Sequence, residues 1–521
     1  MKGSVGLMLT YVVRRIIASF FILIGASFIS YVLVAASGNP LDATLSIPDI
    51  TQRQAKIDQL TRDLHLNVNP VFRFFIWLKG VLGCFVGRCD FGENITGGSV
   101  TADLGHAILI SLRLITAATI FAIIIGVSIG IITALRQYSG LDYTVTFFAF
   151  LFFALPVFWF GVILKDSIGI SFNDFLQKQD GAFSWGAIIV ISVVIGLIAY
   201  ALFGGPIRRR LLTGVIAFAV AFGVLYYITV TNWLINPSLG IVLIALISAA
   251  IGLGVTQLTA GVRNRKALYS SMTTVAVGIA LWYPLQFYFY QGFNFLKLVV
   301  LFVIAIVVGV IVGYLWGGDD RGLSARTGAL TAVGTSFVIF VDRLMRAWHT
   351  YMTNPQIGGR PIKLSLPGTP LLKGDFWIQT TDILTHLLLP TITLMLISLA
   401  THSRFARASM LEVMGQDYIR TARSKGLTER TVIMRHAFRN ALIPITTVIA
   451  FDIAGLVGGA VLTETVFSWK ALGVMFQEGL QKTDPNPVMA TFLIAAVIAV
   501  VANLLADIAY GALDPRIRVR A

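Results

Sequence analysis

The chain has 521 residues, of which 56% are hydrophobic and only 12% are charged, and its mean hydropathy is +0.82. Because a soluble domain carries about twice that charged fraction, this composition indicates a polytopic membrane protein and excludes a soluble one. The net charge of +15 does not indicate nucleic-acid binding, because the basic residues fall in short gaps between apolar runs, where the positive-inside rule places them.

Apolar runs of about 20 residues predict transmembrane helices. The chain contains twelve such runs, near 12–36, 107–134, 143–168, 184–204, 211–231, 238–260, 267–289, 294–317, 326–345, 382–403, 441–464 and 488–512. If the chain starts in the cytoplasm and crosses at each run, every basic cluster between the runs lies inside, as the positive-inside rule requires. We therefore expect a multi-pass protein of the cell (cytoplasmic) membrane with both termini cytoplasmic. The first run is long enough to span, so no cleavable signal peptide is expected.

The first long polar excursion, residues 37–103, lies outside the cell in this topology. Its stretch ITQRQAKIDQLTRDLHL (50–66) has apolar residues at helical spacing, which predicts an amphipathic helix. The aromatic-rich stretch 71–85 is typical of a segment at the membrane interface. Cys84 and Cys89 form either a small disulfide loop or two free thiols on this oxidising side, and two cysteines are too few for a metal site.

A basic stretch, residues 404–440, interrupts the apolar pattern near the end of the chain, and we call it the coupling segment. From Arg404 to Arg439 it contains eight Lys/Arg and three Asp/Glu. Each charge at the centre of a bilayer costs about 3 kcal/mol, so this segment is expected to be a cytoplasmic loop.

Three helices are predicted within the coupling segment, at 405–415, 417–425 and 428–440. Asp417 is suited to cap the second helix, and Gly426 is suited to the left-handed position that ends it. A short helix held at the membrane face can dock into another protein. The alternative is a solvated basic loop that touches only lipid headgroups.

Motifs for chemistry within this chain are missing from the sequence. It has no G-x-x-x-x-G-K-[ST] phosphate-binding loop, no H-E-x-x-H or H-x-x-x-H pair and no G-x-S-x-G. We therefore expect no catalytic residue, no metal site and no cofactor bound by this chain, and a membrane-embedded enzyme is poorly supported. Energy for transport would then come from an ion gradient or from a partner.

Several motifs together resemble the permease subunits of ABC importers, in the oligopeptide/dipeptide branch. In chain order they are MLTYVVRRII (8–17), the external stretch 44–78, DYIRTARSKGL (417–427), RHAFRNALIP (435–444), GGAVLTETVFSW (458–469) and LDPRIR (513–518). The resemblance covers about 1–168 and 355–521. It implies an all-α, type I ABC importer permease fold, in which the coupling segment is the family's EAA loop.

That resemblance also implies partners: a second homologous permease subunit, two ATP-binding subunits that hold ATP and Mg, an extracytoplasmic binding protein and a peptide substrate. Arg420-Thr421-Ala422 takes the place of the E-A-A triplet. Tyr418, Ala422, Gly426 and Leu427 would line the contact with an ATP-binding subunit, while Arg420 and Lys425 would face its acidic or backbone groups. The residues implied in this coupling are Asp417, Tyr418, Arg420, Thr421, Ala422, Lys425, Gly426 and Leu427.

The resemblance divides the chain into parts that match the family and one that does not. The expected parts are the first span (1–36), the external region (37–103), two permease spans (104–168), an inserted bundle of about six spans (169–354) and the permease core (355–521). Permeases of this branch commonly have six spans, so the insertion is atypical; its even number preserves the orientation of every family element. It is expected to be a peripheral, lipid-facing bundle, or alternatively a docking site for a binding protein or an accessory subunit.

Two acids in the last part of the chain are candidate pore residues. Asp452 lies in the middle of a span, and acids within the membrane are candidate functional sites. It either lines the translocation path or is buried between helices without contacting substrate. Glu464, at the outer end of the same span, either belongs to an outer gate, contacts the binding protein or lies at an ordinary solvated helix end.

The sequence leaves one alternative for the cargo and one for the class of transporter. Permeases of the same branch import nickel or other small solutes, and the residues do not exclude such a cargo. A different class, the ion-coupled secondary transporters, is suggested by the twelve spans, but those proteins usually consist of two related halves, and no internal repeat is visible here.

Overall fold

The computed structural model describes residues 2–179, 181–290, 292–318 and 320–513 of the chain. Over these ranges the protein is helical, as the composition predicts, and it forms no β-strand apart from one isolated bridge between Glu93 and Ser99. The termini, which the sequence places in the cytoplasm, and most of the motif at 513–518 lie outside the described residues.

Nine helices in these ranges are long and apolar enough to cross a membrane, and the number rises to ten if one bent helix pair counts as a span. The nine are α1 (Lys2–Ala36), α4 (Val100–Leu135), α8 (Trp185–Leu202), α9 (Ile207–Val230), α10 (Gly240–Thr259), α12 (Phe295–Trp316), α13 (Arg321–Met352), α14 (Phe376–Met414) and α19 (Pro485–Leu513).

The bent pair replaces the single straight span predicted at 143–168. It consists of α5 (Gly140–Ala154) and α6 (Val157–Ile163), which continues through the π-helix η3 (Leu164–Ile170) into α7 (Ser171–Gln179). The helix axis bends by 106° between the two arms. The bend lies at Pro156, and proline disfavours helical geometry in the residue before it, here Leu155 with ψ of 136°.

Two further predicted spans, 267–289 and 441–464, are also helices but are not among the nine. They are α11 (Arg265–Tyr288) and α17 (Phe438–Val466). In α11 the hydroxyl-bearing residues around Ser270 and Thr274 lower the mean hydropathy, and their hydroxyl groups donate hydrogen bonds within the protein. Among the described residues, length and composition give nine or ten spans, whereas the apolar runs of the full sequence predict twelve.

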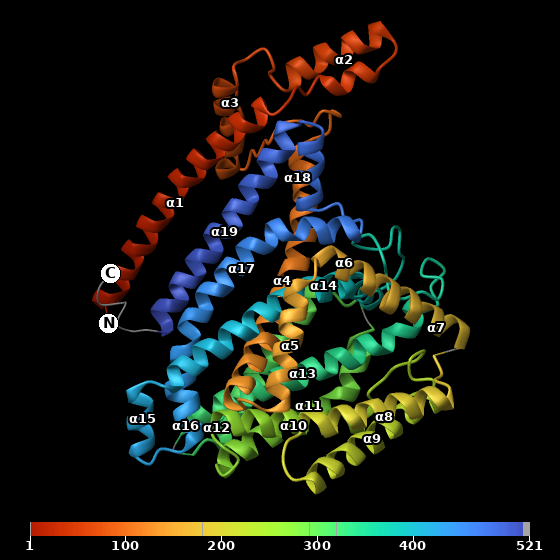
Figure 1. Ribbon diagram of the computed structural model, residues 1–521, viewed down its shortest axis with the longest axis vertical. Coiled ribbons are helices and arrows are strands. Elements are labelled where there is room, and N and C mark those ends of the chain that lie inside the picture. Colours follow the sequence, from red (N-terminus) through yellow and green to blue (C-terminus); the bar gives the residue numbers. More distant parts are fainter. Residues whose placement is uncertain (1, 180, 291, 319, 514–521) are drawn as a thin grey trace.

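The centre of the structure is the pair α4 and α14 (Figure 1), which lie closely against each other. A Cβ atom at Gly130 of α4 would lie 2.5 Å from the carbonyl oxygen of Ser403 on α14, so the approach requires glycine. Small residues let helix backbones pack closely within a membrane. Helices α17 and α19 pack beside this pair. On the other side of α19 lies α1, whose Arg15 forms an ion pair of 3.1 Å with Asp507.

The external region folds into short helices that project from the end of α1. They are η1 (Asp42–Ser46), α2 (Ile50–Asp63), α3 (Pro70–Leu82) and η2 (Gly83–Val86). The amphipathic helix predicted at 50–66 is α2. The interfacial stretch predicted at 71–85 corresponds largely to α3, whose Phe74 and Trp77 pack on Tyr31 of α1. A disulfide joins Cys84 to Cys89 just beyond it.

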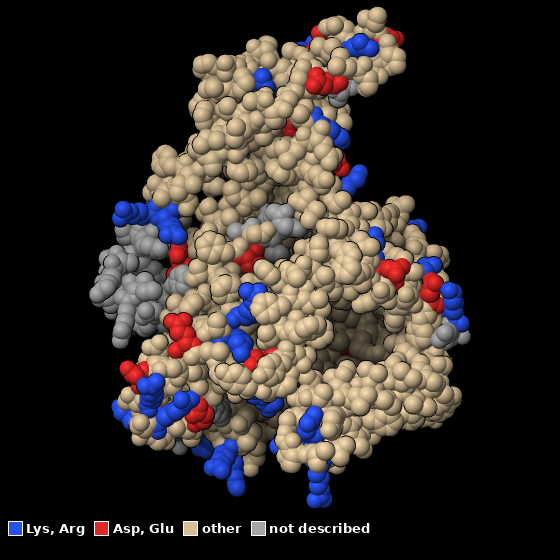
Figure 2. Space-filling view, viewed as in Figure 1, with Lys and Arg blue, Asp and Glu red and all other residues tan. Residues whose placement is uncertain are grey.

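The region between α7 and α14 is a helical bundle centred on α13. Helices α10, α11 and α12 pack on α13, which in turn packs on α14 of the core. The hairpin of α8 and α9 lies to one side, and the surface is hollowed between it and the α6–α7 arm (Figure 2). Asp342 of α13 accepts hydrogen bonds from the backbone N–H groups of Leu239 and Gly240, and so caps α10 from a neighbouring helix.

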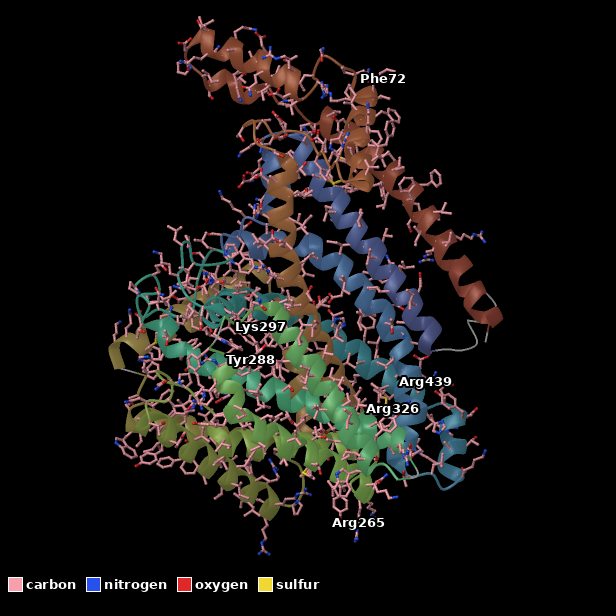
Figure 3. All side chains as sticks on the ribbon, turned by 180° about the vertical axis from the view of Figure 1, so that it is seen from behind. Phe72, Arg265, Tyr288, Lys297, Arg326 and Arg439 are labelled. Atoms are coloured by element: carbon pink, nitrogen blue, oxygen red, sulfur yellow. A yellow bond between two sulfur atoms is a disulfide. The ribbon has the colours of Figure 1, made fainter. Side chains whose placement is uncertain are left out.

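Basic residues gather at one end of the molecule. Figure 3 places Arg265, Arg326 and Arg439 toward one end and Phe72 of α3 at the other. In Figure 2, Lys and Arg cluster along the lower edge, over the coupling segment and the foot of the α8–α9 hairpin. This distribution agrees with the common side that the sequence predicts for the basic clusters.

Candidate functional site: the coupling segment and the buried acids of the core

The coupling segment begins as the end of α14 and then turns sharply. Gly415 ends α14, α15 (Asp417–Ser424) follows, and the chain reverses at Gly426. Gly426 has a φ of +74°, the left-handed conformation that the sequence predicts for it. Thr428 then caps the next turn by accepting a hydrogen bond from the Thr431 N–H.

One correction concerns the start of α15. Asp417 is not the capping residue, because Gln416 holds that position and the Asp417 side chain accepts no capping hydrogen bond. Asp417 instead occupies the first helical turn, where its negative charge interacts favourably with the helix dipole. Its side chain is exposed and lies 3.5 Å from the guanidinium of Arg420.

The inner face of α15 is apolar and buried. Ile419 is 0% exposed and Ala422 is 7% exposed. Both belong to a buried apolar cluster that also contains Met410 of α14, Val432 of the following π-helix and Ala441 of α17. The expectation that Ala422 lines the contact with another subunit is therefore corrected, because its methyl group fills the chain's own interior.

The outer face of α15 and the turn after it are exposed. The exposed members of the implied coupling set are Asp417, Tyr418, Arg420, Thr421, Lys425, Gly426 and Leu427. Tyr418 is anchored at its hydroxyl, which accepts a hydrogen bond of 2.8 Å from the Asn440 side-chain amide. The rest of this face is open, and a Cβ atom added at Gly426 would meet nothing within 4 Å.

An ion pair closes the turn around Gly426. Arg423 on α15 donates two hydrogen bonds to the Glu429 carboxylate, at 2.8 and 3.2 Å. These bonds lower the pKa of Glu429. A two-point contact between arginine and carboxylate fixes geometry as well as distance, so it holds α15 against the following helix.

The third helix predicted in the coupling segment, at 428–440, is not a separate element. It consists of α16 (Glu429–Thr431), the π-helix η4 (Val432–Ala437) and the start of α17. These pieces follow one another without a break, so only the short turn at 425–428 separates α15 from a core span. A hydrogen bond of 2.9 Å from the Ser409 hydroxyl to the Ala441 carbonyl joins α14 to the start of α17.

A partly buried ion pair that the sequence analysis does not identify lies at the start of the coupling segment. Arg407 of α14 donates hydrogen bonds of 2.9 and 3.0 Å to the two carboxylate oxygens of Asp142. Asp142 is 3% exposed and also accepts a bond from the Tyr138 N–H. The two partners are 265 positions apart, and no local pattern marks either of them.

Asp452 lies between two core helices. Its carboxylate accepts a hydrogen bond of 3.0 Å from Ser398 and lies 3.1 Å from Nε2 of His402, both on α14. The Asp452 side chain is 18% exposed, whereas that of His402 is fully buried. Among the described residues, no group of three or more His, Cys, Asp or Glu side chains is placed to hold a metal ion.

Glu464 is buried, at 1% exposure, which corrects the expectations of a solvated helix end and of a surface contact. One carboxylate oxygen accepts a hydrogen bond of 2.7 Å from Ser111 of α4. The other accepts bonds from the N–H groups of Gly473 and Val474, at the start of α18 (Leu472–Gln481). Glu464 therefore joins α4, α17 and α18 at one point.

Comparison of the sequence with known proteins shows the family to which the chain belongs. The model of the family described as "Binding-protein-dependent transport system inner membrane component" matches residues 192–519. The oligopeptide transport system permease protein OppB of Mycobacterium tuberculosis is 38% identical over 234 residues, which are 44% of this chain and 70% of that protein. The dipeptide transport system permease protein DppB of Escherichia coli is 49% identical over 156 residues, 29% of this chain and 46% of that protein. The oligopeptide transport system permease protein AppB of Bacillus subtilis is 25% identical over 513 residues, 98% of this chain and 99% of that protein.

Proposed function

Because this chain belongs to the family of binding-protein-dependent transport system inner membrane components, we propose that it is a pore-forming subunit of an ATP-driven importer of oligopeptides or dipeptides. It pairs with a second, similar permease to enclose one pore. Two ATP-binding subunits act on the coupling segments, and an extracytoplasmic binding protein delivers the peptide. The cargo is inferred from the names of the relatives.

The observation that supports coupling best is the two-sided character of α15. Its inner face, Ile419 and Ala422, is buried against the chain's own core helices, while its outer face is polar and uncovered. A helix of eight residues is too short to be stable alone, so its position is fixed by this packing. Helix α15 is thus a rigid projection, and force that a bound partner exerts on it is transmitted to the core helices.

Movement of α15 has a direct route into the pore helices. After the turn at Gly426 the chain runs through α16 and η4 into α17 without a further break, and Arg423–Glu429 closes that turn. Asp452 and Glu464 both lie on α17, so a tilt of this helix displaces both. An ATP-binding subunit that binds the two states of this assembly unequally shifts the equilibrium between them, which is the physical requirement for coupling.

The docking role is tested with a charge placed on the exposed turn. Leu427 is 40% exposed, and Leu480, at the other end of the molecule on α18, is 44% exposed, so Leu480 provides a matched control. In Leu427→Asp, an unpaired carboxylate would be buried at the interface, which costs more than about 2 kcal/mol. We expect substrate-stimulated ATP hydrolysis by the purified complex to fall at least about tenfold.

The same preparations are assayed for co-purification of the ATP-binding subunits and for peptide uptake into proteoliposomes. Leu480→Asp is expected to keep all three properties. If Leu427→Asp retained hydrolysis, uptake and the bound ATP-binding subunits, the docking role of this turn would be wrong.

A further inference from the structure

An apolar pocket of about 340 Å³ lies between α11, α12 and α13 of the inserted bundle. Its walls are mainly aliphatic and aromatic side chains, among them Leu285, Ile339 and Phe340. Other lining residues are well exposed, including Val299 at 41% and Phe337 at 61%. The pocket therefore opens sideways on the bundle.

The surroundings of the opening restrict what can enter it. Helices α12 and α13 are both long and apolar enough to span the membrane, so an opening in their sides faces hydrocarbon. Water-soluble molecules are excluded from that environment, whereas lipid acyl chains surround it. An occupant of this pocket thus has an apolar body and arrives from the bilayer.

Beside the pocket, on α13, lies a buried cation that has no counter-ion among the described residues. Arg343 of α13 is 4% exposed, and its guanidinium lies 4.5 Å from the ring of Tyr290 and 5.3 Å from that of Trp377. Its Nε is buried and has no hydrogen-bond partner. Across the described ranges, no carboxylate forms an ion pair with it.

The neighbouring carboxylate does not neutralise Arg343. Asp342 is fully engaged, because it accepts bonds from two backbone N–H groups at the start of α10 and from the side chains of Trp282 and Arg346. An unpaired charge within a membrane protein is costly and typically marks a binding site. The aromatic rings offset part of that cost, but they provide no anion.

Arg343 lies next to the pocket. Arg343 follows Ile339 and Phe340 by one helical turn on α13, so all three lie on neighbouring positions of one face. The Trp377 ring beside Arg343 also packs on Phe289 and Phe340, and both of these line the pocket.

A second basic residue lies at this end of the bundle. Lys297 of α12 lies over the Tyr288 ring, 5.8 Å from its centre. Figure 3 shows Lys297 and Tyr288 well away from Arg326, which lies near the start of α13, whereas Arg343 lies toward its end. Positive charge and aromatic rings therefore occur together beside an apolar pocket.

We propose that this pocket binds an anionic glycerophospholipid, with one acyl chain between α11, α12 and α13 and the phosphate on Arg343. Arginine binds phosphate through two parallel hydrogen bonds, and a low dielectric strengthens them. Transfer of the acyl chain from bilayer to pocket involves no hydrophobic gain, so the chain contributes only packing. Selectivity therefore depends on the charged headgroup. The site is independent of the transported cargo.

The test uses the full-length protein purified in mild detergent, with phosphatidylglycerol and phosphatidylcholine as probes. Native mass spectrometry measures how much of each lipid stays bound. Arg343→Gln removes the charge at the site. Arg326→Gln, on an exposed arginine at the other end of the same helix, is the matched control. Ala305→Phe fills the pocket from α12 and leaves Arg343 unchanged.

The wild type and Arg326→Gln are expected to retain phosphatidylglycerol in preference to phosphatidylcholine. Arg343→Gln is expected to lose at least about tenfold in phosphatidylglycerol occupancy, because it removes the charge-assisted hydrogen bonds to the phosphate. Ala305→Phe is expected to reduce occupancy as well. Melting temperatures in lipid-free detergent identify variants that have unfolded, and occupancy is compared only between folded ones.

Three results would overturn the proposal. Equal retention of phosphatidylglycerol by Arg343→Gln would show that this cation holds no headgroup. Equal loss in Arg326→Gln would show that the lipid responds to surface charge in general. Finally, a helix of another subunit cross-linked to cysteines placed at the pocket mouth in the assembled complex would show that the pocket is a protein interface.

Discussion

Ser111 on α4 donates a hydrogen bond of 2.7 Å to Glu464 on α17, 353 positions further along the chain, and both side chains are buried. The Ser111 oxygen also accepts a bond of 3.0 Å from the Leu472 N–H. Through these two residues the first residues of α18 are held against both core helices. A carboxylate at a helix N-terminus satisfies N–H groups that otherwise lack partners and interacts favourably with the helix dipole.

Removal of the Glu464 carboxylate should destabilise this corner. In Glu464→Ala the buried N–H groups of Gly473 and Val474 lose their acceptor, and each such loss costs about 1–3 kcal/mol. We expect the free energy of unfolding, measured in mixed micelles, to fall by about 3 kcal/mol, and that of Glu464→Gln to fall by about half as much. Glu478→Ala, at an exposed site on the same α18, is the control. Equal effects of the two alanine variants would contradict the capping role.

The Arg407–Asp142 pair should behave as a coupled unit. A double-mutant cycle with alanine at each position is expected to give a coupling energy of about 2 kcal/mol in unfolding. This is less than for a fully buried pair, because the Arg407 side chain is 33% exposed. The exposed pair Arg420–Asp417 on α15 is the reference and is expected to show no measurable coupling. Additive effects at Arg407 and Asp142 would exclude a structural role for the pair.

Asp452 should influence which peptides are transported if it lines the path. Asp452→Asn keeps hydrogen-bonding capacity toward Ser398 and His402 but removes the negative charge. We expect the relative uptake of cationic and anionic dipeptides into proteoliposomes to change by about tenfold, which corresponds to 1.4 kcal/mol of lost charge interaction. Asp507→Asn, on α19, controls for loss of an acid elsewhere in the spans. An unchanged uptake profile would assign Asp452 to helix packing alone.

Asp484 should make stability depend on pH. It lies between α18 and α19, is 2% exposed and accepts a bond of 2.7 Å from the Ile95 N–H of the external region. Burial raises the pKa of its carboxyl from 3.8 to about 6, and the Ile95 bond opposes this rise. An acid with a raised pKa in the folded state destabilises that state once it ionises. Stability contributed by this residue is therefore lost as the pH rises from about 4 to about 6, by up to about 3 kcal/mol.

Asp484→Asn supplies an acceptor for the Ile95 N–H and does not titrate. Melting temperatures of the purified protein between pH 4 and pH 7 should therefore show a smaller decline in this variant than in the wild type. Glu478→Gln, at an exposed carboxyl on the same side, should keep the wild-type slope. A wild-type slope in Asp484→Asn would place the pH-sensitive group elsewhere.

Prediction from sequence succeeds for the parts of this structure that depend on residues close together in the chain. The position of α2 follows from apolar spacing, while the end of α15 and the left-handed turn there follow from Gly426, which lacks a side chain. The bend at Pro156 carries a local signal too, yet a continuous apolar run conceals it. Ala422 shows the limit of a motif: a residue that resembles a contact position can instead fill the interior, because a motif does not state which side of a short helix is buried.

The sequence by itself determined the class of the protein, the location of its helices and its family, because apolar run length, charge placement and local motifs are properties of adjacent residues. Only the tertiary structure decided which polar groups of the core meet: Glu464 with Ser111, Asp452 with His402, and Arg407 with Asp142. It alone shows that Arg343 has aromatic neighbours and no counter-ion within the described residues. The physical reason is that a buried charge is stabilised by groups within about 4 Å, and packing brings those groups from helices far apart in the chain.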